Sequence, residues 1–464
     1  MDLLVSLCKR RGFVYPGSEI YGGFANSWEY GPYGVELRNN MKREWWKKFV
    51  HGRDDMVGIE TPIIMNPKAW EASGHLQAFS DPLVDCKKCK RRFRADHLLE
   101  ARAAEPGYDM EQPLDLKDFR CPLCGGDLTN IRQFNLMLKT YVGPTEDAAS
   151  VAYLRPETAG GMFVVWKNVR DSMRKKLPFG IAQIGKAFRN EITPGNFIFR
   201  TREFEQMEIE YFVKPEDAPK AFETWLDEQK SWVTDVLKLD PAHVVYHEIP
   251  DADRAFYSAR SVDTEYRYPF GVKELYGIAN RTDYDLSRHQ KFSGEDLRWL
   301  DPDTGEKSLP YVIEPTWGLD RTVLVLLLEH LDIDEAPTAA ESEVQKSESL
   351  KVEGTEPRMV LRLPPKLAPV TVALLPLQKK EELTHVARDL TNALRSRGIV
   401  VEYDDGASIG KRYRRQDEIG TPWCVTVDFD SLEDKKVTIR DRDTMTQERV
   451  PIADVPSWIA SRLL

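Results

Sequence analysis

The chain has 464 residues and a formal net charge of −10, which allows two or three domains because a single hydrophobic core stops growing at roughly 250–300 residues. No apolar segment approaches the ~20 residues that a membrane-spanning helix needs, and the first residues lack the basic-then-apolar order of a secretion signal. We therefore expect a cytoplasmic protein with neither a membrane nor DNA as a partner. The acidic balance argues against indiscriminate nucleic-acid binding, so an RNA partner would have to meet local basic patches, of which residues 87–94 and 411–415 are the candidates.

The first 333 residues are expected to form one large domain, interrupted by an insertion at residues 85–131. A helix-like run at residues 35–50 leads into the apolar segment Gly58-Ile-Glu-Thr-Pro-Ile-Ile-Met. Residues 215–239 carry large apolar side chains at spacings of three, four and seven, which predicts a helix with one buried face.

Four of the six cysteines form two Cys-x-x-Cys pairs, Cys86 with Cys89 and Cys121 with Cys124. Each pair can supply two thiolates to a tetrahedral ion, so we expect a structural zinc site, although the gap between the pairs exceeds the usual roughly 15–20 residues. Two redox pairs are the alternative, but neither pair sits at a strand-to-helix junction, and a cytosolic protein has little use for structural disulfides.

Residues 188–212 predict a hairpin that turns at Thr-Pro-Gly-Asn. Side chains alternate between the faces of a strand, so one face of the second strand should carry a charged and aromatic set, namely Arg200, Arg202, Phe204, Gln206, Glu208 and Glu210. The other face should carry Phe199, Thr201, Met207 and Ile209. On the preceding strand Arg189 and Glu191 share a face. Arginines bind phosphates, so the charged face is a candidate nucleotide platform; a solvated amphipathic hairpin is the alternative that spacing leaves open.

The last part of the chain changes composition twice. Residues 334–358 contain Pro, Ala, Ser, Glu and Lys with almost no large apolar residues, so they cannot bury enough surface to fold and are expected to be a flexible linker. Residues 359–464 alternate strand-like and helix-like patterns, which predicts a compact α/β domain.

The Phe-Arg-x-Glu, loop, Arg-x-x-x-Phe arrangement at residues 188–204 resembles the second signature motif of class II aminoacyl-tRNA synthetases. Residues 35–65 are similar to the first, dimer-forming motif, with Pro62 in the signature position, and residues 318–321, Gly-Leu-Asp-Arg, are similar to the third. Four further segments resemble the homodimeric glycyl-tRNA synthetases, and the resemblance covers most of the chain: residues 154–159, 204–208, 277–283 and 312–316.

This resemblance implies an α+β fold with a catalytic domain on an antiparallel sheet at residues 1–333, a zinc-ribbon-like insertion at 85–131 and an anticodon-binding domain at 359–464. It also implies a homodimer that activates glycine with ATP and Mg²⁺ and transfers it to the 3′ end of tRNA(Gly). Positioning and electrostatic stabilisation suffice for this chemistry, which needs no protein nucleophile.

The resemblance assigns catalytic roles to three residues of the nucleotide site. Arg189 would bind the α-phosphate and the substrate carboxylate. Glu191 would contact the adenine amino group or hold the loop between the two strands. Arg321 would reach the γ-phosphate and stack on one face of the base, with Phe204 on the other face. Glu274 is a plausible magnesium ligand. The full implied ATP-binding set is Arg189, Asn190, Glu191, Phe199, Arg200, Thr201, Arg202, Glu203, Phe204, Glu274, Leu275, Gly318, Leu319, Asp320 and Arg321.

Glycine has no side chain that a binding site could contact, so its selection depends on binding its ammonium group and on sterically excluding amino acids with a side chain. Glu157, Glu208 and Glu314 match the acidic positions of the family's glycine pocket, and such carboxylates attract an ammonium group. The full implied glycine-binding set is Arg94, Glu157, Phe204, Glu205, Gln206, Met207, Glu208, Arg281, Glu314, Thr316 and Gly318.

This chain departs from the family pattern at four places. Thr316 stands where serine is usual, Trp317 where a smaller residue is common, Gly160 where glutamine is usual and Val272 where tryptophan is frequent. Two alternatives also stay open: a class II synthetase for another amino acid, such as histidine, threonine or proline, and a catalytically inactive synthetase-like RNA-binding protein.

Overall fold

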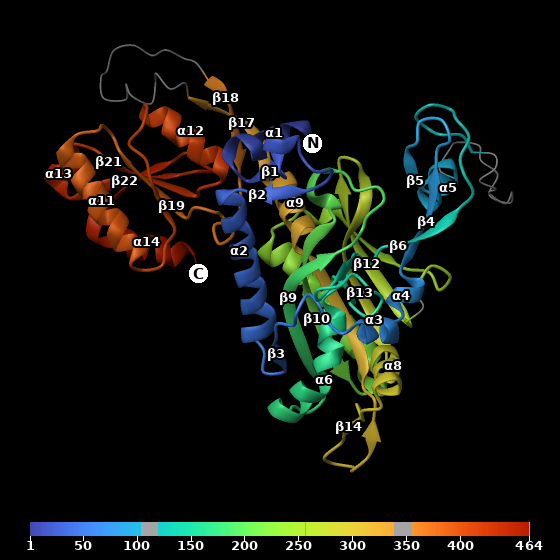
Figure 1. The fold of residues 1–464 in the computed structure, drawn as a ribbon. Coiled ribbons are helices and arrows are strands. Elements are labelled where there is room, and N and C mark those ends of the chain that lie inside the picture. Colours follow the sequence, from blue (N-terminus) through green and yellow to red (C-terminus); the bar gives the residue numbers. More distant parts are fainter. Residues whose placement is uncertain (104–118, 256, 338–354, 464) are drawn as a thin grey trace.

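The structure, a computed structural model, describes residues 1–103, 119–255, 257–337 and 355–463 (Figure 1). A seven-stranded sheet of order β11-β12-β13-β16-β10-β9-β3 organises the larger part of the molecule. Only the β3–β9 pair is parallel; the other neighbours run antiparallel. The strands are β3 (Met56–Gly58), β9 (Phe179–Phe188), β10 (Glu203–Val213), β11 (Val244–Glu248), β12 (Arg260–Tyr268), β13 (Gly271–Thr282) and β16 (Tyr311–Gly318).

Helices cover both faces of this sheet. On one face, α2 (Pro32–Trp46), α7 (Ala218–Ser231) and α9 (Leu319–His330) pack into the main hydrophobic core with the side chains of Met207 and Ile209. On the other face, α6 (Ala159–Met173) packs on Phe212, and the rings of Trp166 and Phe212 lie 4.1 Å apart. The alternation along β10 thus sends odd-numbered residues to the main core and even-numbered residues to the face that carries α6.

The predicted helices lie where the apolar spacing placed them. The run at residues 35–50 is α2 followed by a single π-helical stretch, Lys47–His51, and the run at 215–239 contains α7, whose residues Phe222, Trp225 and Leu226 are buried. Gly318 is the N-cap of α9. The prediction of helices at residues 35–50 and 215–239 is confirmed.

The cysteine-rich insertion carries its own three-stranded sheet of order β5-β4-β6 and projects from the main body (Figure 1). Its elements are β4 (Ser80–Asp85), β5 (Arg92–Arg94), α5 (Ala95–Ala103) and β6 (Arg132–Asn135). Strand pairing therefore extends this unit beyond the predicted limits of residues 85–131 at both ends, because β4 and β6 pair from Ser80 to Asn135.

Shorter elements complete the first part of the chain. They are α1 (Asp2–Arg11), β1 (Val14–Pro16), β2 (Trp28–Tyr30), α3 (Pro67–Ser73), α4 (His75–Ala78), β7 (Lys139–Tyr141), β8 (Val151–Tyr153), α8 (Tyr284–Ser293), β14 (Trp299–Leu300) and β15 (Lys307–Ser308).

The predicted linker is shorter than residues 334–358. Its two ends belong to an antiparallel ribbon of β17 (Leu331–Pro337) and β18 (Thr355–Leu361), and residues 338–354 lie outside the described part of the chain. The polar composition was misleading at these ends because Arg358, fully buried, is held there by Asp334 and Asp417.

The C-terminal part is an α/β unit around a five-stranded sheet of order β20-β19-β21-β22-β23 with its own core. Its elements are β19 (Val372–Pro376), α11 (Glu381–Arg395), β20 (Val401–Tyr403), α12 (Ile409–Ile419), β21 (Trp423–Val427), α13 (Asp430–Asp434), β22 (Lys436–Asp441), β23 (Gln447–Pro451) and α14 (Val455–Arg462).

The basic run at residues 411–415, a candidate RNA patch, is partly engaged within the protein, while Lys411 is exposed. Arg412 is buried and donates to the carbonyl oxygens of Pro376 and Asp404, and Arg415 pairs with Asp404 at 2.6 Å. The run lies on α12, so its side chains alternate between the core and the surface with helical period. Among the described helices, none is long and apolar enough to span a bilayer.

Candidate active site

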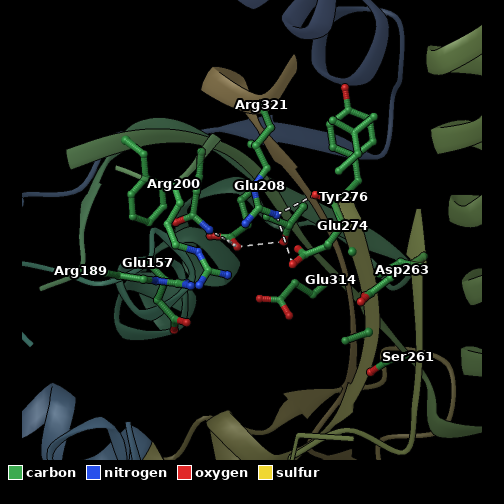
Figure 2. Close-up of a pocket in the computed structure, with 18 of the residues that line it drawn as sticks. Glu157, Arg189, Arg200, Glu208, Ser261, Asp263, Glu274, Tyr276, Glu314 and Arg321 are labelled. Carbon is green, nitrogen blue, oxygen red and sulfur yellow. Dashed lines mark hydrogen bonds and ion pairs between the residues drawn. The ribbon is translucent and has the colours of Figure 1, made fainter. Parts of the chain in front are cut away.

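A cavity of about 410 Å³ opens on the sheet where β10, β13 and β16 lie side by side. The connection between β9 and β10 and the start of α9 close its other sides. Figure 2 shows the labelled arginines and glutamates converging on this cavity from different elements. The predicted residues that line it are Glu157, Arg189, Glu191, Phe199, Arg200, Thr201, Phe204, Glu205, Gln206, Glu208, Glu274, Leu275, Glu314, Thr316, Gly318, Asp320 and Arg321.

The hairpin differs from prediction near its turn. β9 ends at Phe188 and β10 begins at Glu203, so Arg189, Arg200 and Arg202 lie in the connection rather than on the strands. A turn at Phe197–Phe199, buried against the main core, interrupts the alternation. As a result Phe199 lines the cavity, although strand parity placed it on the opposite face.

Arg189 lines the part of the cavity that the sequence predicts to bind the nucleotide, which we call the nucleotide half. Its Nε donates to the carbonyl oxygen of Pro156 at 3.1 Å, and its guanidinium carbon lies 5.3 Å from the ring centroids of both Phe79 and Phe204. These contacts hold the arginine beside the exposed part of Phe204 while leaving other donors of the guanidinium fork for an anion.

Arg321 occupies the opposite side of the same half. Its Nη1 lies 3.1 Å from the Glu274 carboxylate, and its guanidinium carbon lies 4.6 Å from the Phe199 ring centroid. Arg321 lowers the pKa of Glu274, with help from Arg189 and Arg200 against the effect of burial. The Glu274 carboxylate is therefore charged at neutral pH and half exposed, which suits a magnesium ligand.

Glu157 precedes α6 and forms one wall of the acidic half. His75 Nε2 lies 3.3 Å from Oε2 of Glu157. Oε1 of Glu157 is buried and has no hydrogen-bond partner within the described part of the chain. Burial opposes its charge, but His75, Arg281 and Arg189 lower the pKa of Glu157 to about 2. A charged, buried carboxylate oxygen that accepts no hydrogen bond is unfavourable by itself, so this oxygen is suited to bind a cationic ligand.

Glu208 forms the floor beside it. Its side chain accepts hydrogen bonds from the hydroxyl groups of Thr158 and Thr316, the latter at 2.9 Å, and from Gln206 Nε2 at 3.3 Å. β10 and β16 pair Glu208 directly with Thr316, which explains that contact. Burial and the neighbouring Glu157 raise the pKa of Glu208.

Glu314 lies on β16 and is held by Arg281. Nη1 of Arg281 donates to both oxygens of Glu314 at 2.9 Å, and the rest of the guanidinium group binds Asp285 at 2.7 and 2.9 Å. The register between β13 and β16 shifts between Asn280 and Thr282, so Arg281 sits at an irregularity that can re-aim a side chain. Burial raises the pKa of Glu314, and the charge of Arg281 opposes this effect.

Seven predicted binding residues do not line the cavity. Among the described residues, these are Arg94, Asn190, Arg202, Glu203, Met207, Arg281 and Leu319. Arg281 acts through Glu314 as described, whereas Arg94 pairs with Asp81 and Asp96 of the insertion. Arg202 donates to the carbonyl oxygen of Ala25.

Met207 and Glu205 differ from prediction because odd-numbered residues of β10 point to the face of the sheet that carries the main core. Met207 packs in the main core, and the carboxylate of Glu205, although that residue lines the cavity, binds Arg38 at 2.6 Å and Lys42 at 3.2 Å on α2. Trp317 likewise packs against Trp45 and Phe49, so this departure from the family pattern does not narrow the cavity.

Sequence reasoning missed several residues of the site. His75 reaches Glu157 from α4, and Asp263 on β12 lines the cavity near Glu274 (Figure 2). Burial raises the pKa of Asp263 to about 7, with Glu274 and Glu265 adding to the effect. Other lining residues that were not among the predicted binding residues are Ile198, Ile249, Asp253, Arg254, Ala255, Tyr257, Ser261, Tyr276, Gly277, Ile278 and Ala279. A period-2 pattern on β12 was the available signal for Ser261 and Asp263.

The four cysteines of the insertion meet in one cluster, as predicted. Their sulfur atoms lie within 4.8 Å of one another, with Cys86–Cys124 at 3.5 Å and Cys89–Cys121 at 3.6 Å. Four thiolates about 2.3 Å from a tetrahedral zinc ion stand ~3.8 Å apart, so the donor set fits that ion. Backbone N–H groups at Cys89 and Lys88 lower the pKa of the Cys86 thiol, whereas burial and the neighbouring thiols raise the pKa of Cys89.

Comparison with known proteins agrees with this geometry. Residues 144–330 match the family profile described as tRNA synthetase class II core domain (G, H, P, S and T), and residues 371–462 match the one described as anticodon binding domain. A prolyl-tRNA synthetase from Cryptosporidium parvum, solved with L-proline and AMP, has a similar fold with a TM-score of 0.63 at 16% identity, covering 100% of this chain and 77% of that one.

Whole-chain relatives are more specific. The chain is 53% identical to a glycine–tRNA ligase of Thermobifida fusca and 51% identical to one of Clostridium acetobutylicum, in each case over 100% of this chain and 98% of the relative. Identity at this level over the whole chain excludes the alternative that the chain belongs to a synthetase family for another amino acid. The chain belongs to the glycine–tRNA ligases, with the catalytic core of a class II aminoacyl-tRNA synthetase and an anticodon-binding domain.

Proposed function

We propose that the cavity ligates glycine to the 3′ end of tRNA(Gly) in two steps. The glycine carboxylate attacks the α-phosphorus of ATP, which forms glycyl-adenylate and releases diphosphate, and a ribose hydroxyl of tRNA then accepts the glycyl group and releases AMP. One observation carries the proposal: a single cavity is lined by Arg189, Arg200 and Arg321 and also by the three pocket glutamates. The glutamates come from three separate segments, and the arginines come from the β9–β10 connection and α9. The three pocket glutamates are Glu157, Glu208 and Glu314. A purely RNA-binding relative has no need of this arrangement.

In the nucleotide half, Arg189 binds the α-phosphate and the glycine carboxylate, because its guanidinium carbon lies 5.3 Å from the Phe204 ring centroid and its charge lowers the pKa of Glu157. Figure 2 shows Arg189 and Glu157 on the same side of the cavity. Phe204 stacks on the base, and Arg321 covers the opposite face. Arg321 is engaged by Glu274, so nucleotide binding exchanges this ion pair for a phosphate contact. Glu274 is then released to hold Mg²⁺, which supplies neutralisation of the phosphate charge.

In the acidic half, Glu157, Glu208 and Glu314 receive the ammonium group of glycine. Thr316 lines the cavity and donates its hydroxyl group to Glu208, and its additional methyl group, compared with serine, limits the room for a β-carbon. Exclusion of bulk is the effective strategy here, since no amino acid is smaller than glycine, whereas a site that has to reject a smaller ligand gains only about 1–3 kcal/mol per methylene.

The rest of the molecule serves the RNA substrate. Residues 359–464 bind the anticodon region of tRNA(Gly), residues 35–65 form a homodimer interface, and the protein acts in the cytoplasm. The family match to an anticodon-binding domain supports the first of these roles, and the resemblance of residues 35–65 to a dimer-forming motif supports the second.

The function is tested by amino-acid-dependent exchange of diphosphate into ATP. Glycine should support exchange and alanine, serine and proline should not. Arg189→Ala should lower the glycine-dependent rate by at least ~10²-fold, because a donor aimed at developing phosphate charge is lost, and should leave the affinity for tRNA unchanged. Arg267→Ala, an exposed arginine on β12, is the matched control. Exchange with another amino acid but not glycine would refute the assignment, and parallel loss of tRNA affinity in Arg189→Ala would mean that the loop binds RNA.

A further inference from the structure

A fourth carboxyl group lies behind the acidic half of the site. Glu210 follows Glu208 by two residues on β10, so both side chains leave the same face of the sheet. Glu210 is completely buried, and neither of its side-chain oxygens has a hydrogen-bond partner among the residues that the structure describes. One oxygen each from Glu208, Glu210 and Glu314 lies within 4.8 Å of the other two.

These three carboxyl groups differ in the hydrogen bonds that they accept. Glu208 is bound by two hydroxyl groups, and Glu314 receives two hydrogen bonds from Arg281, whereas Glu210 receives none. Further along the same face Phe212 packs on Trp166, so Glu210 stands between the cavity floor and an apolar core. The charged groups that face it are Glu208 on β10, Glu314 on β16, Arg281 on β13 and Asp285 on α8.

A buried carboxyl group with no cationic or hydrogen-bonding partner keeps its proton. Three like charges at this separation cannot all persist, and a cluster of interacting acids titrates as a unit. Burial and the charge of Glu314 raise the pKa of Glu210 well above its usual range. Since Arg281 balances Glu314, the proton of the cluster resides on Glu210.

We propose that Glu210 is a positioning residue of the glycine subsite. It stays uncharged and holds the proton of the cluster, so that Glu208 and Glu314 direct their charges toward the ammonium group of glycine. Were Glu210 ionised, its repulsion would drive its two neighbours apart and break their contacts with Thr316 and Arg281. This role rests on the glycine subsite proposed above.

The test compares the full-length wild type with Glu210→Gln, which keeps size and neutrality. The infrared difference spectrum at pH 7 should show the C=O stretch of a protonated carboxyl group in the wild type that the variant lacks. In diphosphate exchange, the KM for glycine should stay within about twofold of the wild type. Glu216→Gln, an exposed glutamate just beyond the end of β10, is the control and should leave that band in place.

Two results would overturn the proposal. One is a carboxylate band in place of the C=O stretch; the other is a rise of about tenfold or more in the KM for glycine at unchanged kcat, which would make Glu210 a charged part of the subsite. A pH titration of the wild type alone gives a second measurement, independent of the variant's folding. The C=O band should persist above neutral pH, and its loss in the ordinary carboxyl range contradicts the proposal.

A failure of the subsite itself has a different signature. Glu314→Gln should raise the KM for glycine if the ammonium group binds there. If Glu314→Gln leaves that KM unchanged, the glycine subsite is misassigned and the positioning role of Glu210 falls with it. The infrared band then still reports whether Glu210 is protonated.

Discussion

Thr316 shows how one hydroxyl group connects selectivity with electrostatics. It lies directly across from Glu208 in the β10–β16 pair and donates to its carboxylate at 2.9 Å. Its methyl group adds volume where serine would leave space. The residue therefore both satisfies a buried acid and narrows the cavity, and two substitutions separate these contributions.

Thr316→Val keeps the shape and removes the donor. Since a hydrogen bond to a charged group contributes about 1.5–3 kcal/mol, the KM for glycine should rise by roughly tenfold or more. Thr316→Ser keeps the donor and removes the methyl group, so the KM for glycine should change little while discrimination against alanine weakens by up to ~10-fold. Steady-state exchange with glycine and alanine measures both. Equal effects of the two variants would show that the hydroxyl group does not support Glu208.

At the scale of elements, the start of α6 depends on a glycine that departs from the family pattern. A Cβ atom at Gly160 would lie 2.7 Å from the ring of Trp70 on α3. Alanine in a helix interior gains about 1 kcal/mol over glycine, whereas overpacking a core costs about 1–3 kcal/mol. The steric term prevails here because Trp70 is itself fully buried and cannot move away.

Gly160→Ala should therefore lower the free energy of unfolding by about 1–2 kcal/mol, as measured by urea denaturation. Trp70→Leu in the same chain opens the space, so the double variant should lose less than the sum of the two single variants. Strict additivity would show that the helix start and α3 are not coupled. Because α6 follows Glu157 directly, the single variant should also raise the KM for glycine.

A second prediction at the scale of elements concerns the zinc content of the cysteine cluster. Purified protein should contain close to one zinc ion per chain by elemental analysis, and Cys121→Ser should lose it, since a structural site needs all four thiolates. Protease cleavage should then begin between β4 and β6, where the cluster holds the insertion together. Cys8→Ala removes a cysteine buried in the main core and is the control for zinc content. Full zinc binding by Cys121→Ser would refute the site.

At the scale of the whole molecule, buried charges connect the β17–β18 ribbon with the C-terminal sheet. Arg358 binds Asp334 on the ribbon and Asp417 on α12, and Arg440 on β22 also binds Asp417, at 2.8 Å. Tyr33 on α2 donates to Glu402 at 2.5 Å. These contacts set the position of the C-terminal unit relative to the catalytic sheet.

Arg358→Met should leave Asp417 buried with fewer donors and destabilise the C-terminal unit by about 3–5 kcal/mol. Transfer of glycine to tRNA should fall by at least tenfold, while diphosphate exchange, which needs only the cavity, should remain. Comparing the two rates in one preparation separates these steps. Arg397→Met, at an exposed position after α11, is the control for unfolding. Equal loss of both rates would show that the network supports the cavity itself.

The features predictable from sequence are local ones. Local patterns located α2 and α7, the two Cys-x-x-Cys pairs indicated one cluster, and motif order indicated the family. Strand parity correctly put Phe204, Gln206 and Glu208 together on β10, because alternation is a property of the strand alone. It failed for Phe199 and for the arginines of the connection, where a buried 3₁₀ turn replaces the strand.

The sequence by itself determined the family, the order of the domains and the amino-acid types of the site, since those follow from local pattern and motif. Only the tertiary structure decided which charges balance one another. His75 meets Glu157 from a distant helix, Arg281 is shared by Asp285 and Glu314, Glu205 turns away to α2, and Glu210 is left without a partner. The reason is physical: burial and charge depend on which strands and helices become neighbours, and chain order does not specify that.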